Sequence, residues 1–139
     1  MAILEICAGS VESAIAARDG GAARIELCAA LEIGGTTPSA GLIAEARKIE
    51  GIVLNVIIRP RGGDFLYNEH EAACMEQDIR TCRQLGADGI VIGALTADGD
   101  IDTALCKRLI DTAKGMSVTF HRAFDMCRDP KRALEELIA

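Results

Sequence analysis

The sequence of 139 residues contains no tryptophan, one tyrosine and three phenylalanines, so its core must be built from aliphatic side chains. It also lacks long apolar runs. The longest, residues 52–58, includes Asn55, whereas about 20 apolar residues are needed to cross a bilayer. The first residues have neither the basic region nor the apolar segment of a signal peptide. We therefore expect a cytoplasmic protein with no membrane partner.

Basic runs and paired cysteine motifs are absent as well. Fifteen Lys and Arg residues against 21 Asp and Glu residues give a net charge of -6, which disfavours a nucleic acid partner. None of the six cysteines forms a C-x-x-C pair. In a reducing compartment we expect these cysteines to be free thiols rather than a disulfide framework.

Short apolar runs alternate along the chain with longer segments of helical period, which is typical of βα units. The predicted strands are residues 2–8, 24–28, 52–58, 89–92 and 116–120. Predicted helices follow them: one capped by Ser10 through residue 19, one capped by Ser39 through residue 50, one over 69–85, one from Asp100 or Asp102, and one from Asp129-Pro130 to the last residue.

Five consecutive βα units without a linker predict a single α/β domain over residues 1–139, part of a TIM (β/α)8 barrel rather than a doubly wound sheet. A closed barrel normally needs at least about 200 residues, so about three units are missing from this chain. An incomplete barrel has an exposed sheet edge, which favours association. We therefore expect a homo-oligomer in which another copy covers this edge.

The first two strands share a sequence pattern, Leu4-Glu-Ile-Cys-Ala and Ile25-Glu-Leu-Cys-Ala. Side chains alternate along a strand, so each glutamate shares a face with its cysteine. The repeat predicts that the Glu and Cys face is the barrel interior, with Cys7 and Cys28 at matching positions. The other face should pack under the helices through Leu4, Ile6, Ile25 and Leu27.

The same alternation turns polar side chains inward in strands three and five: Asn55, Arg59, Thr119 and His121. Buried carboxylates need cationic or hydrogen-bonding partners. We expect Arg59 and His121 to be the partners of Glu5 and Glu26. Ligands of such barrels bind at the carboxyl ends of the strands, where the arginine, the histidine and both strand-end cysteines should lie.

Two kinds of chemistry are open to these residues. Converging thiolates of Cys7 and Cys28 would suit a soft ion such as Cu(I), although both cysteines could simply be packing residues. Alternatively, Arg59 and Arg61, in a glycine-containing loop, could bind an anion while Glu26 or His121 moves a proton. On that hypothesis Glu26, Arg59 and His121 are the candidate catalytic residues. The arginines could instead neutralise interior carboxylates.

Several motifs identify a resemblance that covers essentially the whole chain: Leu4-Glu-Ile-Cys, Arg24-Ile-Glu-Leu-Cys, Arg59-Pro-Arg-Gly-Gly-Asp-Phe and Thr119-Phe-His-Arg-Ala-Phe-Asp. In this order and spacing the sequence resembles the CutC copper homeostasis family. The resemblance implies a TIM barrel, a cytoplasmic location, homo-oligomers and a role in copper tolerance or trafficking. It also implies Cu(I) ligands at Cys7 and Cys28.

Three functional hypotheses remain after this reading. The first is a Cu(I)-binding protein that uses the strand-end cysteines. The second is a barrel enzyme that acts on a small anionic substrate through Arg59, Glu26 and His121. The third is a fragment that keeps the packing of the family without its function.

Overall fold

The structure is a computed structural model and describes residues 2–139. Strands and helices alternate along the chain. The strands are β1 (Glu5–Ala8), β2 (Arg24–Leu27), β3 (Val53–Ile57), β4 (Gly89–Ile92) and β5 (Ser117–Phe120). The helices are α1 (Val11–Asp19), α2 (Ala40–Arg47), α3 (Glu69–Gln84), α4 (Thr103–Thr112) and α5 (Pro130–Ile138), with 3-10 helices η1 (Leu31–Ile33) after β2 and η2 (Arg122–Met126) after β5.

The helices begin at the polar residues that the sequence predicts. The N-caps are Ser10 for α1, Ser39 for α2, Asn68 for α3, Asp102 for α4 and Asp129 for α5, and each side chain accepts a hydrogen bond from a first-turn N–H. Asn68 and Glu71 also form a reciprocal capping box. The predicted helix ends are less accurate. The second helix was expected to run through residue 50, but α2 stops at Arg47 and the chain then turns before β3.

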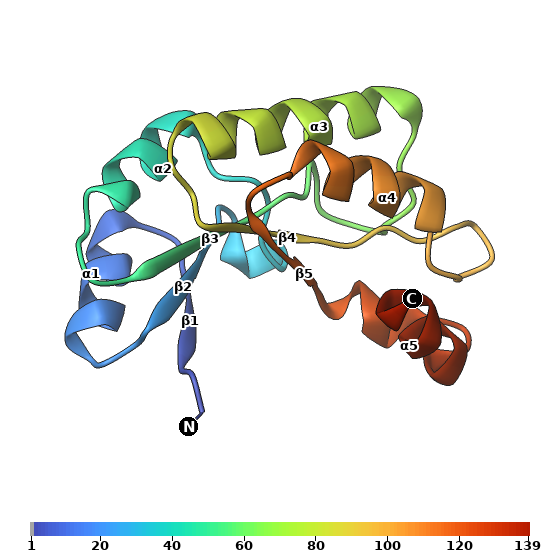
Figure 1. Ribbon diagram of the computed structural model, residues 1–139, viewed down its shortest axis with the longest axis horizontal. Coiled ribbons are helices and arrows are strands. Elements are labelled where there is room, and N and C mark those ends of the chain that lie inside the picture. The colour runs from blue at the N-terminus through green and yellow to red at the C-terminus, as the bar shows by residue number, and fades with distance from the viewer. Residues whose placement is uncertain (1) are drawn as a thin grey trace.

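The five strands form one parallel sheet in the order β1-β2-β3-β4-β5, which leaves β1 and β5 as its edges. Figure 1 shows α2, α3 and α4 lying together over one side of the sheet, whereas α5 lies apart from this layer. Five βα units in sequential order are the architecture of a partial TIM barrel, as predicted. No helix within residues 2–139 is both long and apolar enough to cross a bilayer.

Aliphatic side chains from the outer face of the sheet form the core against the helices. Ile25, Leu27, Leu54 and Ile90 have no exposed surface. The prediction that Leu4 and Ile6 pack under helices is wrong, because Leu4 is 52% and Ile6 36% exposed. Helix α1 contacts both β1 and β2, but β1 is an edge strand with a neighbouring strand on one side only, which leaves these two side chains exposed.

The register of the strands sets which inward-facing side chains lie side by side. Cys7 pairs with Glu26, and Glu26 pairs in turn with Asn55. The prediction that Cys7 and Cys28 occupy matching positions is therefore wrong: Cys28 lies two residues beyond Glu26, directly after the end of β2. The sequence repeat is offset from the register because strands of a barrel are staggered along its axis.

Candidate functional site

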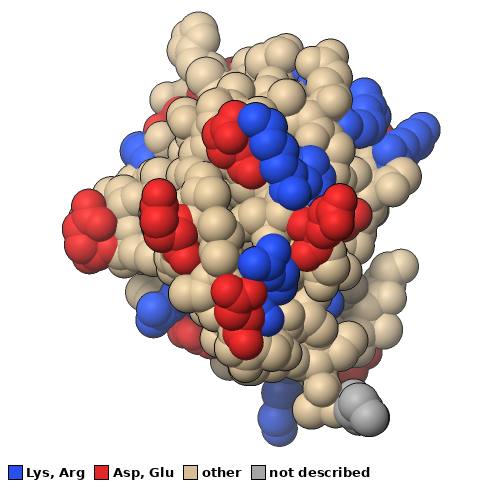
Figure 2. All heavy atoms as spheres, turned by 90° about the vertical axis from the view of Figure 1, so that its left-hand side faces the viewer, with Lys and Arg blue, Asp and Glu red and all other residues tan. Residues whose placement is uncertain are grey.

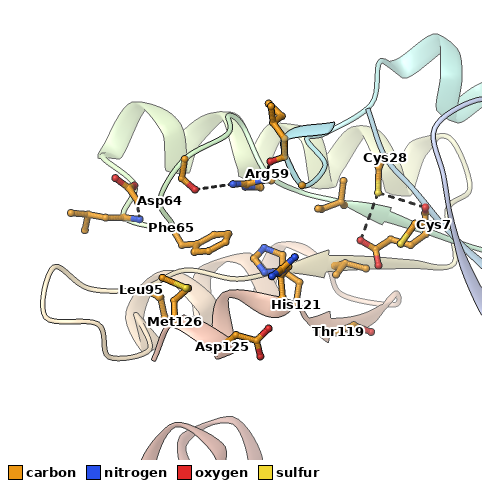
Figure 3. Close-up of a pocket in the computed structure, with 18 of the residues that line it drawn as sticks. Cys7, Cys28, Arg59, Asp64, Phe65, Leu95, Thr119, His121, Asp125 and Met126 are labelled. Carbon is orange, nitrogen blue, oxygen red and sulfur yellow. Dashed lines mark hydrogen bonds between the residues drawn. The ribbon is translucent and has the colours of Figure 1, made fainter. Parts of the chain in front are cut away.

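A cavity of about 990 Å³ lies at the carboxyl ends of the strands. Figure 3 shows its two functional ends: Cys7 and Cys28 lie at one end, and Arg59, Phe65 and His121 lie toward the other. Much of the wall between and around them is apolar, with contributions from Ile57, Val91 and Leu95. The position agrees with the rule that parallel barrels bind ligands at this end of the sheet.

The thiols of Cys7 and Cys28 line the same part of this cavity. Cys7 is exposed, whereas Cys28 is buried, and both are free thiols. Burial is the largest cause that raises the pKa of both thiols. The charge of Glu26 raises both pKa values further, and the pKa of Cys28 is also raised by its neighbour Cys7. The two sulfurs therefore share one electrostatic environment and are protonated at neutral pH.

The carboxylate of Glu26 is close to the Cys28 thiol, with 3.7 Å between Sγ and Oε1. Burial and the nearby charge of Glu5 raise the pKa of Glu26. A carboxyl group with a raised pKa beside two thiols could exchange protons with them. Glu26 therefore belongs to the thiol end of the cavity.

The predicted partners of the interior carboxylates are wrong. Glu5 forms an ion pair with Arg24 and accepts a hydrogen bond from Asn55 Nδ2 at 3.2 Å. Arg24 stands at the start of β2, level with Glu5, so the register brings these opposite charges together. Neither Arg59 nor His121 forms an ion pair with Glu5 or Glu26 among the described residues.

Arg59 instead connects three loop carbonyls. Its Nη1 donates to the carbonyl oxygens of Ile33 and Gly35, both at 3.0 Å, and its Nη2 donates to that of Gly63 at 2.8 Å. The side chain is 5% exposed. The Arg59 side chain therefore connects the loop after β2 to the loop after β3 by hydrogen bonds, and these use most of its N–H donors.

The structure separates Arg61 from Arg59. The Arg61 guanidinium forms ion pairs with Glu71 and Asp64 and is not part of the cavity wall within residues 2–139. The hydrogen bond from Arg61 lowers the pKa of Asp64, whereas the pKa of Glu71 is lowered first by the backbone N–H of Asn68 and then by Arg61. The predicted anion clamp of two arginines is thus not assembled in this geometry, because Arg61 connects its own loop to the start of α3.

His121 follows β5 and lies in Figure 3 between the two cysteines and the far end of the cavity, where Leu95 and Met126 lie. Its Nδ1 accepts a hydrogen bond from the Ala123 N–H at 3.1 Å. Burial and the charge of Arg59 lower the pKa of His121 to about 4, so the ring is neutral at physiological pH. A neutral ring that accepts at Nδ1 has its proton on Nε2.

Two residues of this arrangement were not selected from the sequence. Phe65 packs on His121, with ring centroids 5.2 Å apart, and lies 5.0 Å from the guanidinium carbon of Arg59. Gly93 makes room for His121, because a Cβ there would lie 2.6 Å from Nδ1. The sequence offered one indication of the role of Gly93. It directly follows a strand whose residues are all buried, at a position where a larger side chain would point into the barrel.

A parallel sheet of βα units with a cavity at its strand ends defines the chain as a partial TIM barrel. The model of the CutC family matches residues 2–139, and the chain belongs to this family. It is 58% identical over 137 residues to a CutC family protein of Chromobacterium violaceum, covering 99% of this chain and 56% of that protein. A mouse relative named copper homeostasis protein cutC homolog is 53% identical over 136 residues, covering 98% of this chain and 50% of that protein.

The fold is also that of a solved member. The structure of a CutC protein from Streptococcus agalactiae matches with a TM-score of 0.94 and 38% identity, covering 99% of this chain and 68% of that chain. This agreement confirms the fold predicted from the order of the βα units. The chain spans about half the length of the curated relatives it matches.

Proposed function

We propose that this chain binds Cu(I) between the thiolates of Cys7 and Cys28 and acts in copper homeostasis in the cytoplasm. The observation that supports this most is the placement of two thiols on neighbouring strands and on one cavity wall. Soft thiolate ligands favour Cu(I). The free state of all six cysteines agrees with a reducing compartment, and the name of the mouse relative agrees with copper homeostasis.

The two thiols lie close enough to interact. Cys7 is level with Glu26, so Cys28, two residues further along the chain, is its diagonal neighbour across adjacent strands. Besides burial, a hydrogen bond between the two thiols contributes to the pKa of each. One soft ion could therefore contact both sulfurs. Within residues 2–139 no group of three or more His, Cys, Asp or Glu side chains could hold a metal, so the proposed site has two ligands.

Copper binding at this site should depend strongly on pH. Burial and Glu26 raise the pKa of both thiols, so Cu(I) must displace two protons. The apparent affinity should rise by up to about 100-fold per pH unit below the thiol pKa values. We expect titration of the reduced protein against a competing Cu(I) chelator, repeated at several pH values, to give one ion per chain with this dependence.

Single serine variants test the ligands. Cys7→Ser and Cys28→Ser should each abolish tight Cu(I) binding, whereas Cys74→Ser is the matched control because Cys74 is an exposed thiol of α3 outside the cavity wall. Binding that survives both site variants, or that does not change with pH, would contradict the proposal and leave both thiols as packing residues.

We propose further that a second copy of the chain covers the open edges of the sheet. Both edge strands run in the same direction, so β1 of one copy can extend the sheet beyond β5 of another. Apolar side chains are exposed along these edges: Leu4 directly before β1, Ile6 on β1, and Val118 on β5. Sedimentation velocity at micromolar concentration should give a species larger than a monomer, and Ile6→Lys should shift it toward the monomer. A monomer in the unmodified protein would contradict this proposal.

A further inference from the structure

Arg59 and His121 converge from strands that are not neighbours. Ile57 pairs with Val91, and Val91 pairs with Thr119. Continuing this register by two residues places Arg59, Gly93 and His121 at one level across β3, β4 and β5. Because the middle position is glycine, the two long side chains can approach each other over it. Their proximity is the reason why the charge of Arg59 lowers the pKa of His121.

The positive charge of Arg59 has no counterion among the described residues. Arg24, by contrast, pairs with Glu5, and Arg61 pairs with Glu71 and Asp64. The guanidinium of Arg59 donates its hydrogen bonds to neutral carbonyls and lies near two other uncharged groups, the Phe65 ring and the Tyr67 hydroxyl. The residue is 5% exposed, and its Nε has no hydrogen-bond partner within residues 2–139. A buried charge without an opposite charge is strongly unfavourable. This end of the cavity is therefore electrostatically suited to an anion.

His121 offers a second free donor at the same place. Its Nδ1 is engaged by the Ala123 N–H, so its proton lies on Nε2, and Nε2 is buried without a partner in the described chain. Leaving such a buried donor unpaired is unfavourable, because it has lost its hydrogen bonds to water. The ring cannot turn away to find another partner, because Gly93 and Phe65 enclose it.

We propose that Arg59 Nε and His121 Nε2 bind the carboxylate of a small, otherwise apolar molecule in the strand-end cavity. Two N–H donors match the two oxygens of one carboxylate. The apolar wall formed by Ile57, Val91 and Leu95 would accommodate the rest of the molecule. A phosphate is disfavoured relative to a carboxylate, because Glu26, Asp64 and Asp125 also line the cavity and would repel a doubly charged ion more strongly than a singly charged one.

The side chain of Phe65 covers this site. It contacts both Arg59 and His121, and neither free donor atom is open to solvent. Phe65 lies in the loop between β3 and α3, so its ring can move without breaking a strand or helix. The carboxylate would take the place of the ring beside the two donors.

The chain contains only two histidines, His70 and His121, so their imidazole nitrogens can be distinguished by two-dimensional ¹H–¹⁵N NMR. Before any ligand is added, His121 should be the Nε2–H tautomer. Cyclohexanecarboxylate should then shift the His121 Nε2 resonance saturably, in the roughly millimolar range expected for a small molecule. Cyclohexanol and inorganic phosphate should each bind about tenfold or more weakly, because the first lacks the charge and the second is repelled.

Variants separate this site from general packing. His121→Phe should abolish the response to cyclohexanecarboxylate, whereas His121→Gln should keep part of it because glutamine retains a donor near the Nε2 position. Phe65→Ala should strengthen binding several-fold by removing the cover. His70→Gln is the matched control, since His70 lies exposed in the first turn of α3, and should bind like the unmodified protein.

Several outcomes would overturn the proposal: an Nδ1–H tautomer of His121, cyclohexanol binding as tightly as the carboxylate, phosphate binding more tightly, or no saturable response in both the unmodified protein and Phe65→Ala. The Cys7→Ser and Cys28→Ser variants should keep carboxylate binding, and His121→Gln should keep Cu(I) binding. Failure of one proposal is therefore distinguishable from failure of the other.

Discussion

The two ends of the strand-end cavity differ in charge although the same parallel strands form both. At the β1 and β2 end, Glu26 faces the thiols and the pKa of Cys7, Cys28 and Glu26 is raised. At the β3 to β5 end, the unpaired charge of Arg59 faces His121, whose pKa is lowered. The raised pKa values keep both thiols protonated at neutral pH. The lowered pKa of His121 keeps its ring neutral, with no proton on Nδ1. One end is thus suited to a soft cation and the other to an anion.

The face drawn in Figure 2 shows no such division. Acidic and basic side chains lie beside each other there rather than in patches of one sign. Exposed ion pairs such as Lys48 with Glu45 and Arg18 with Asp19 contribute little to stability. The separation of charge in the cavity contrasts with this mixed face, and burial makes it matter energetically.

The largest expected difference between the two ends is in stability. Arg59→Met should lower the free energy of unfolding by about 3 kcal/mol or more, because it leaves the carbonyls of Ile33, Gly35 and Gly63 without their donor. Chemical denaturation would measure this loss. Cys7→Ser at the other end and the exposed Arg122→Met should each change stability by less than about 1 kcal/mol. Equal losses at both ends would contradict this contrast.

Acid should destabilise the protein through His121. Its pKa in the folded state is about 4, against an ordinary value of 6.5, so the unfolded chain binds more protons between these two pH values. Stability present above about pH 6.5 should fall as the pH is lowered toward 4, by a total of about 3 kcal/mol. The raised pKa of Glu26 acts in the opposite direction and offsets part of this loss.

Denaturant unfolding as a function of pH would measure the effect of His121. His121→Phe should remove this acid-induced loss, because the imidazole that takes up the extra proton on unfolding is gone and only the opposite effect of Glu26 remains. His70→Phe should keep the slope of the unmodified protein. A slope that is identical in all three proteins would show that other groups control the acid response.

The smallest expected effect is on thiol reactivity. Glu26→Gln removes a negative charge that raises the pKa of Cys7 and Cys28, so their pKa values should fall. The shift should be below about one pH unit, since burial is the larger cause and remains. The pH profile of alkylation of Cys7 by iodoacetamide, followed by peptide mass spectrometry, would measure it. An unchanged profile would mean that Glu26 does not act on the thiols.

Local sequence determines much of this architecture. Ser10, Ser39 and Asn68 cap their helices as predicted, because capping depends on a side chain and the next few backbone N–H groups. The order of the five βα units predicts a partial barrel for a similar reason: parallel strands need a crossover, and the helices supply it. The inward direction of Asn55 and Arg59 follows from the alternation of side chains along a strand.

Contacts between units were decided only by the tertiary structure. The sequence repeat placed Cys7 beside Cys28, but the stagger of the strands pairs Cys7 with Glu26. It also paired Glu5 with Arg24 and left Arg59 to three loop carbonyls. Register and loop geometry depend on packing between residues far apart in the chain. The sequence by itself therefore determined which side chains face the cavity, and the tertiary structure decided which of them meet.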